Sequence, residues 1–169
     1  MGRGSGWQVE GIFNFVPNVV SFLLTPDLRR WYIIGAYVSP NKTPTVYHED
    51  QDLESATRRV EVILLGDLNV RLRELRNKRE EELATKLADS WLVNMIAHFM
   101  PRRRYREGRC WTWRMRQEGR KVTDRGDYVL STDRHNFSNA GVREAKLHTD
   151  QRMVLVVLRG EGVLRHCRQ

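Results

Sequence analysis

The pattern of apolar and polar positions is centred on the stretch VEVILLGDLNV, residues 60–70. Four consecutive apolar residues, 62–65, predict a strand that is buried on both faces, because a strand buried on one face alternates apolar with polar positions. Gly66 interrupts this run, and Asp67 and Asn69 follow it. We expect these two polar side chains to lie on a turn at the carboxyl end of the strand, where the sheet holds the loop in place.

Other segments rich in apolar, β-branched and aromatic residues predict further strands, and Gln117–Arg120 has the composition of a hairpin turn. These strands are expected at residues 7–15, 19–24, 31–38, 110–115, 122–130, 140–144 and 153–158. Together with the helices below, their order predicts a mixed α/β domain built from packed layers.

Residues 80–99 show the spacing of an amphipathic helix. Apolar side chains recur every four residues, which places them on one helix face and predicts that they pack in the core. They are Leu83, Leu87, Trp91, Met95 and Phe99. Residues 48–59 are polar, contain no helix breaker and are expected to form a short surface helix.

The turn after the central strand has two interpretations. A carboxylate at Asp67 and an amide at Asn69 can share one water, one phosphate or one metal ion. Alternatively, either side chain bonds its own backbone in an Asx turn, which is the ordinary structural role of these residue types.

The charge of the chain adds a further indication of function. The chain has 29 Lys and Arg against 21 Asp and Glu, and much of this excess of positive charge lies in one segment. Residues 101–121 hold nine basic and two acidic side chains, which favours a phosphate-rich partner. The alternative is a solvated basic surface. Cys110 and Cys167 have neither zinc-site nor redox-pair spacing. With no secretory signal or membrane-spanning segment in view, we expect an intracellular protein, nuclear or cytoplasmic, that does not bind membranes.

Five short segments, in this order, resemble the motifs of one family. They are Tyr37-Val38-Ser39-Pro40-Asn41, Gly66-Asp67-Leu68-Asn69, Thr112-Trp113, Arg125-Gly126-Asp127-Tyr128-Val129-Leu130 and Thr149-Asp150-Gln151. The chain resembles the endonuclease/exonuclease/phosphatase superfamily, most of all the endonuclease domain of LINE-type (non-LTR) retrotransposons, over residues 7–158. The resemblance implies a DNase I-like four-layer α/β sandwich, with two packed mixed sheets flanked by helices. Residues 1–6 are expected to be a flexible tail and residues 159–169 a basic tail.

The resemblance also implies a chemistry, the cleavage of phosphodiester bonds with a divalent metal, usually Mg²⁺. Asp67 would activate or orient the attacking water, and Asn69 would position the water and the phosphate. Tyr37 would bond the phosphate region, Asp150 would lie beside the metal, and Asp127 would orient the side chain at position 151. Phosphoryl transfer requires such positioned oxygens and donors.

The basic region would bind nucleic acid, most of all DNA. The residues expected to contact it are Arg102, Arg103, Arg104, Arg106, Arg114, Arg116 and Thr112. Trp111 and Trp113 either stack on bases among these arginines or pack against the sheet.

Two departures from the family pattern affect the expected activity, and a third, at Gly126, is milder. Gln151 stands where the family has a catalytic histidine, and an amide cannot titrate. The family's first strands, with a Gln-Glu-Thr motif whose glutamate binds the metal, have no counterpart before Trp7, so we expect the first strands to be missing and Mg²⁺ to bind weakly or not at all. Missing strands predict an open apolar sheet edge and association. Gly126 replaces a β-branched residue, which lowers strand propensity.

Three functions remain open from the sequence. The first is a metal-dependent phosphodiesterase of the endonuclease type, and the second is a catalytically dead relic that binds nucleic acid without sequence preference. The third is a phosphatase that acts on small phosphoesters. The isolated chain is expected to cleave DNA very slowly or not at all.

Overall fold

The structure is a computed structural model that describes residues 7–13, 18–26, 30–39, 60–72, 75, 77–100, 111–144 and 152–159. Its strands are β1 (Trp7–Phe13), β2 (Val19–Pro26), β3 (Trp31–Tyr37), β4 (Glu61–Asp67), β5 (Val93–Asn94), β6 (Trp113–Gln117), β7 (Arg120–Asp124), β8 (Asp127–Ser131), β9 (Phe137–Glu144) and β10 (Arg152–Leu158). Its helices are α2 (Lys78–Asp89), α3 (Met95–Phe99) and the short 3₁₀ helix η2 (Arg134–Asn136).

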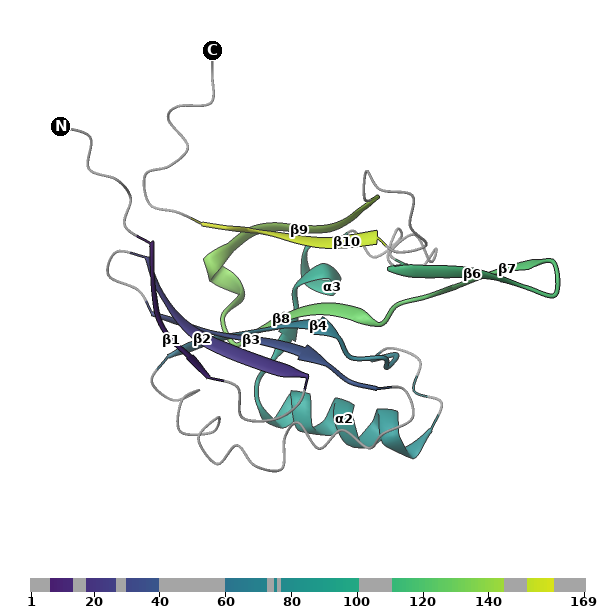
Figure 1. Cartoon of the computed structure of the whole chain (residues 1–169), viewed down its shortest axis with the longest axis horizontal. Helices are drawn as coiled ribbons and strands as arrows, with labels where there is room; N and C mark the ends of the chain where they lie inside the picture. The colour runs from purple at the N-terminus through teal and green to yellow at the C-terminus, as the bar shows by residue number, and fades with distance from the viewer. Residues whose placement is uncertain are drawn as a thin grey trace, which may run out of the picture.

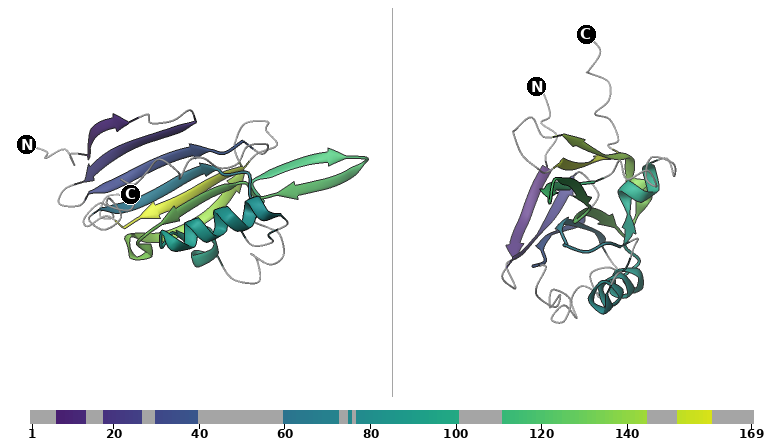
Figure 2. Two further views of the ribbon diagram at one scale, coloured as in Figure 1. Left: turned by 90° about the horizontal axis from the view of Figure 1, so that it is seen from below. Right: turned by 90° about the vertical axis from the view of Figure 1, so that its right-hand side faces the viewer.

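One six-stranded sheet forms the centre of the molecule, with the strand order β1-β2-β3-β4-β8-β5. Strands β3 and β4 run parallel, and the other neighbours in this sheet run antiparallel. The antiparallel pair β9–β10 lies over one face of this main sheet, and α2 lies against the other face (Figures 1 and 2). The antiparallel pair β6–β7 projects from one end (Figure 1).

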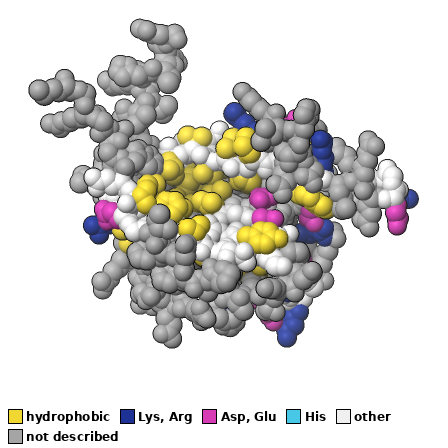
Figure 3. All heavy atoms as spheres, viewed as in Figure 1, with side chains coloured by type: hydrophobic (Ala, Val, Ile, Leu, Met, Phe, Trp, Pro, Cys, Tyr) yellow, Lys and Arg dark blue, Asp and Glu magenta, His cyan; other side chains and the backbone are white. Residues whose placement is uncertain are grey.

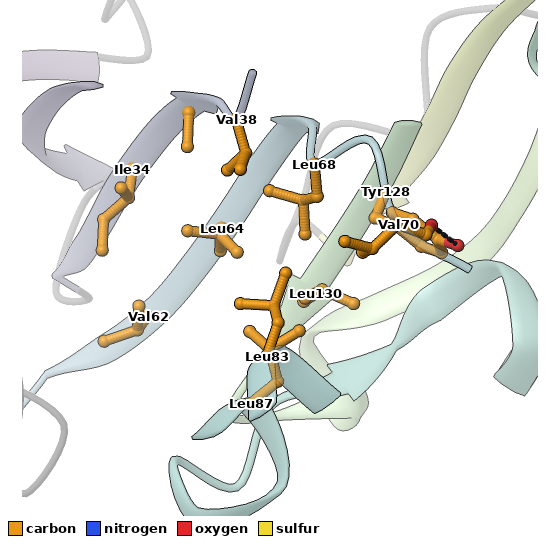
Figure 4. Close-up of a cluster of buried hydrophobic side chains, with 11 residues drawn as sticks. Ile34, Val38, Val62, Leu64, Leu68, Val70, Leu83, Leu87, Tyr128 and Leu130 are labelled. Atoms are coloured by element: carbon orange, nitrogen blue, oxygen red, sulfur yellow. Dashed lines mark hydrogen bonds between the residues drawn. The ribbon is translucent and has the colours of Figure 1, made fainter. Parts of the chain in front are cut away.

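The central strand β4 is buried on both faces, as its apolar run predicted. Val62 and Leu64 pack with Leu83 of α2 in one cluster (Figure 4), whereas Ile63 packs on the opposite face. Leu65 differs from the prediction, because 40% of its surface is exposed. The second layer therefore covers the start of β4 more completely than its end.

The second apolar cluster joins the main sheet to β9 and β10. Its buried members include Trp31, Ile63, Met95 and Phe137, from β3, β4, α3 and β9. The described part of the chain thus forms three layers, which are α2, the main sheet and the β9–β10 pair. This arrangement confirms the prediction of an α/β fold with packed sheets, although helices flank it sparsely.

The prediction of one helix across residues 80–99 is wrong. Helix α2 ends at Asp89, and the backbone of Trp91 is left-handed, with φ of 58°. The amide of Leu92 donates to the carbonyl of Leu87, which closes the helix end. Trp91 is 82% exposed, so its assignment to the core is also wrong. Helix α3 then begins on the other side of the sheet, where Met95 is buried.

The predicted strand at 122–130 is two strands, because Arg125 and Gly126 separate β7 from β8. The hairpin turn at Gln117–Arg120 is confirmed, and Glu118 and Gly119 have the positive φ angles of a tight two-residue turn. The predicted helix at 48–59 lies outside the described residues. Within the described part, no helix is both long and apolar enough to cross a membrane.

Candidate active site at the carboxyl ends of two parallel strands

The strand register brings three of the predicted site residues into one row. Tyr37 pairs with Asp67 across the parallel strands β3 and β4, and Asp67 pairs with Asp127 across β4 and β8. Paired residues on neighbouring strands point to the same face, so all three side chains share one surface of the sheet. This is the face that also carries the β9–β10 layer, through Ile33 and Ile63 of the same strands.

Two residues near the end of β4 have positive φ angles, Gly66 within the strand and Asn69 just after it. Gly66 has φ of 142°, and a Cβ atom at this position would lie 1.9 Å from the carbonyl oxygen of Ala36. Asn69 is left-handed, and its amide donates to Asp67 Oδ1 at 3.0 Å. The Asx turn considered for these residues is therefore present, and it fixes the direction of the Asp67 carboxylate.

Asn69 is held from two further directions. Its side-chain Nδ2 donates to the carbonyl of Val38 at 3.0 Å, which ties the ends of β3 and β4 together. The Arg79 guanidinium donates to the carbonyl oxygens of Asn69 at 3.3 Å and Ser39 at 2.9 Å. A cation in the first turn of a helix opposes the helix dipole. We infer that these bonds to both strand ends offset that cost.

Thr112 positions the segment that leads into Asp127. Its hydroxyl accepts bonds from the amides of Gly126 at 3.2 Å and Asp127 at 3.3 Å, and its own amide donates to the carbonyl of Asp124. The side chain is completely buried. The side chain that was expected to contact nucleic acid thus lies inside the domain, where it positions the backbone before Asp127.

We expect Thr112→Val to destabilise the domain by about 1–3 kcal/mol, because two amides lose their acceptor in a buried place. Urea denaturation followed by circular dichroism measures this change. Thr112→Ser is the matched control, because it keeps the hydroxyl and should retain most of the stability. Equal midpoints for the valine variant and the parent would show that the hydroxyl has no positioning role.

Gly126 leaves space for the Asp67 carboxylate. A Cβ atom on Gly126 would lie 2.5 Å from Asp67 Oδ1. The sequence suggested that glycine here weakens a strand, but Gly126 lies between β7 and β8. Its role in this structure is thus a close approach to the site rather than a loss of strand propensity.

A cavity of about 520 Å³ opens where these elements meet. Its lining combines acidic, basic and amide side chains. The lining residues are Tyr37, Asp67, Asn69, Val70, Arg71, Asn77, Arg79, Glu80, Trp113, Asp124, Arg125, Gly126 and Asp127. Arg71 forms a two-point ion pair with Asp124, which joins the loop after β4 to the end of β7.

Burial raises the pKa of Asp67 above its ordinary value of 3.8, and the negative charge of Asp127 raises it further. Hydrogen bonds from Asn69 act in the opposite direction and favour the ionised form. A carboxyl group with a raised pKa in a cavity is a candidate proton acceptor.

Most of the remaining predicted site residues lie outside the part of the chain that the structure describes. Gln151, Asp150 and the arginines at 102, 103, 104 and 106 lie outside the described residues, as does the side chain of Arg116. Arg114 is exposed on β6, and its guanidinium lies 5.2 Å from the ring centre of Trp111. Among the described residues, no three acidic, histidine or cysteine side chains form a metal-binding group.

Several lining residues were not anticipated from the sequence. Arg71 and Asp124 are distant along the chain, and no local motif marks their pairing. Arg79 had one usable signal, since an arginine directly after a helix start is electrostatically unfavourable without a partner.

The layers are those of the DNase I-like α/β fold that the motifs implied, and the similarity to solved structures confirms that fold. The endonuclease domain of TRAS1, a telomere-specific non-LTR retrotransposon, is similar with a TM-score of 0.67 and 18% identity, over 85% of this chain and 64% of that chain. An endonuclease/exonuclease/phosphatase family protein from Leptotrichia buccalis C-1013-b is similar with a TM-score of 0.56 and 14% identity, over 84% of this chain and 54% of that chain.

The AP endonuclease LMAP from Leishmania major is similar with a TM-score of 0.52 and 15% identity, over 85% of this chain and 55% of that chain. The chain thus spans between about half and two thirds of the length of these three proteins. No protein-family model matches the sequence, and no curated protein matches it.

Proposed function

We propose that this chain binds nucleic acid and slowly hydrolyses phosphodiester bonds at the cavity beside β3, β4 and β8. The observation that carries this proposal is the row formed by Tyr37, Asp67 and Asp127 at the strand ends. The same residue types at the same positions of the motifs carry the chemistry of the family that the sequence resembles. The similarity of the fold to two proteins described as endonucleases supports the same reaction class.

Asp67 and Tyr37 have chemical roles that suit their surroundings in the cavity, and two arginines add positive charge beside them. Asp67, with its raised pKa and its fixed direction, would take a proton from the attacking water. Tyr37 is 47% exposed, so its hydroxyl is available to bond a phosphate oxygen. Arg79 and Arg125 add positive charge to the cavity, which stabilises a bound phosphate.

We propose Mg²⁺ as the cofactor. Asp67 and Asp127 are its candidate ligands among the residues that the structure describes, and Asp150 is the ligand that the sequence resemblance implies. Mg²⁺ in phosphate-processing sites is commonly held by one or two carboxylates, together with water and substrate phosphate. Burial is the main reason that the pKa of Asp67 is raised, and the negative charge of Asp127 adds to it. A bound cation would favour the ionised form of both carboxyl groups, so these residues fit a divalent metal. When bound, the metal would supply charge stabilisation for the phosphate and a more acidic water.

Gln151 is the reason that we propose slow turnover. A histidine at this position would carry a proton at neutral pH, whereas an amide donates hydrogen bonds but does not titrate. Loss of one acid–base group commonly costs about 10²–10⁴-fold in rate.

The test is a plasmid-nicking assay with Mg²⁺, in which four proteins are compared. We expect slow nicking by the parent and by Asp89→Ala, an exposed aspartate at the end of α2 that serves as the matched control. Asp67→Ala should abolish nicking, and Gln151→His should raise the rate by up to about 10²–10⁴-fold.

No nicking by the parent or by Gln151→His, in chains that circular dichroism shows to be folded, would overturn the hydrolase proposal. The second candidate, a nucleic-acid-binding domain without turnover, is favoured by the exposed Arg114 and Arg120 on the projecting β6–β7 pair. In that case the inactive parent would still retard labelled DNA in a gel, and retardation would weaken steeply with salt.

A further inference from the structure

The ion pair between Arg71 and Asp124 lies on the wall of the cavity rather than inside the domain. Arg71 follows β4, Asp124 is the last residue of β7, and both side chains line the cavity. Arg71 Nε donates to Asp124 Oδ1 at 2.6 Å, and Nη2 donates to Oδ2. The two side chains are 25% and 28% exposed, so a molecule in the cavity can reach this pair.

Other bonds also join the two segments that this ion pair connects. The buried Tyr128 hydroxyl lies 2.8 Å from the carbonyl oxygen of Val70 (Figure 4) and 3.1 Å from that of Arg125. The same hydroxyl accepts a bond from the amide of Leu72 at 3.3 Å. The loop after β4 is therefore held to the end of β7 from inside the domain, and a partly exposed ion pair adds little to such a link.

The charge of the cavity makes each of its arginines important for binding an anion. Among the described residues that line the cavity, four are acidic and three are arginines. The acidic residues are Asp67, Glu80, Asp124 and Asp127, and the arginines are Arg71, Arg79 and Arg125. Figure 3 shows acidic side chains (magenta) and Lys or Arg side chains (dark blue) close together toward the end from which β6–β7 projects.

The geometry of the ion pair is one that a phosphate can reproduce. A guanidinium presents two parallel N–H groups, and a carboxylate or a phosphate offers two oxygens that match them. Arg79 donates to backbone carbonyls of the strand ends, which fixes its position, whereas the printed bonds of Arg71 go to another side chain at the cavity wall. Arg71 is thus the arginine whose partner a phosphate can most readily replace.

We propose that Arg71 is a phosphate-binding residue of the cavity and that Asp124 is the group that a phosphodiester displaces from it. Asp124 holds the guanidinium until two phosphate oxygens take the places of its carboxylate oxygens. Asp124 Oδ1 also accepts a bond from the Arg125 amide at 2.8 Å, so the carboxylate stays in place when Arg71 turns to the phosphate. This inference rests on the proposed function, because it takes a phosphodiester as the ligand of the cavity.

The probe is the dinucleotide thymidylyl-thymidine, which carries a single phosphodiester, so its binding does not sum over many basic side chains. Its affinity for the whole chain is measured by NMR titration with EDTA present and at constant salt, where metal-dependent hydrolysis does not occur. We expect Asp124→Asn to bind the probe about threefold to tenfold more tightly than the parent. Asparagine keeps the acceptor for the Arg125 amide but does not hold the guanidinium in an ion pair.

Two further variants show whether this gain passes through the arginine. The double variant Arg71→Gln/Asp124→Asn should bind no more tightly than Arg71→Gln alone, because the released guanidinium is absent from both. Asp89→Asn is the matched control, since it removes the same charge from an exposed aspartate at the end of α2 and should leave the affinity unchanged. Circular dichroism confirms folding, and Asp124→Ser, which also keeps an acceptor, replaces Asp124→Asn if the latter unfolds.

Three results would overturn the proposal. An equal gain from Asp124→Asn in the Arg71→Gln background would show that Asp124 acts only by charge repulsion. Weaker binding by Asp124→Asn than by the parent would show that the ion pair positions the cavity wall instead. The third is no binding of the probe by any of the proteins. The nicking assay separates these failures from that of the proposed function, because nicking that requires Asp67 would leave the hydrolase proposal standing.

Discussion

Gly66→Ala is expected to destabilise the domain by at least about 4 kcal/mol, which is a large part of the stability of an ordinary domain. The added Cβ would lie 1.9 Å from the carbonyl oxygen of Ala36, and that oxygen belongs to the backbone of the neighbouring strand. The φ angle of 142° is also strained for any L-residue with a side chain. Neither problem is relieved by a rotamer change, so β3 and β4 must separate at the site.

Urea denaturation of this variant measures the loss, and Gly141→Ala is its matched control. Gly141 lies in β9, where an added Cβ meets no atom within 4 Å, so that variant should change stability by less than about 0.5 kcal/mol. A Gly66→Ala protein with the midpoint of the parent would contradict the close approach of the two strands.

The second large effect is expected for Phe137→Ala, at about 3–5 kcal/mol. Phe137 is completely buried at the start of β9, in the cluster that includes Met95 and Ile63. Removing its ring leaves a cavity between the layers, which the surrounding side chains fill only in part. Thermal denaturation measures the loss, and hydrogen exchange should rise first in β9 and β10, because this cluster attaches them to the main sheet.

Val157→Ala is the control for that variant, because Val157 lies on the same pair of strands but is 52% exposed. We expect it to cost less than about 1 kcal/mol. Unchanged exchange in β9 and β10 of Phe137→Ala would mean that another contact holds the second layer.

Short sequence patterns, such as apolar runs and turn residues, predicted the elements whose structure depends on neighbouring residues. The apolar run at 62–65 identified a strand buried on both faces, and Glu118-Gly119 identified a hairpin turn. The helix break at Trp91 was missed, because the apolar spacing continues across it. Leu87 and Met95 look like one stripe in the sequence, yet they pack on opposite faces of the main sheet.

In the candidate site, too, features set by neighbouring residues were predictable, whereas features set by tertiary packing were not. Asp67 and Asn69 were predicted because they are adjacent to a buried strand, and Tyr37 and Asp127 because they lie in recognisable motifs; the structure brings all four to one cavity. The burial of Thr112 was not predictable, because it depends on how the segment before β6 packs against the turn before β8. The Arg71–Asp124 pair likewise depends on tertiary structure and has no sequence signature.

The parallel pairing of β3 with β4 also has a consequence for folding kinetics. Tyr37, Asp67 and Asp127 come from segments that are far apart in the chain, so each contact in the row requires closure of a long loop. Non-local pairings of this kind form slowly, whereas the β1–β2 and β6–β7 pairs form between near neighbours. We therefore expect the β1–β2 and β6–β7 pairs to form early. The row of Tyr37, Asp67 and Asp127 would be completed last, when β8 joins the sheet.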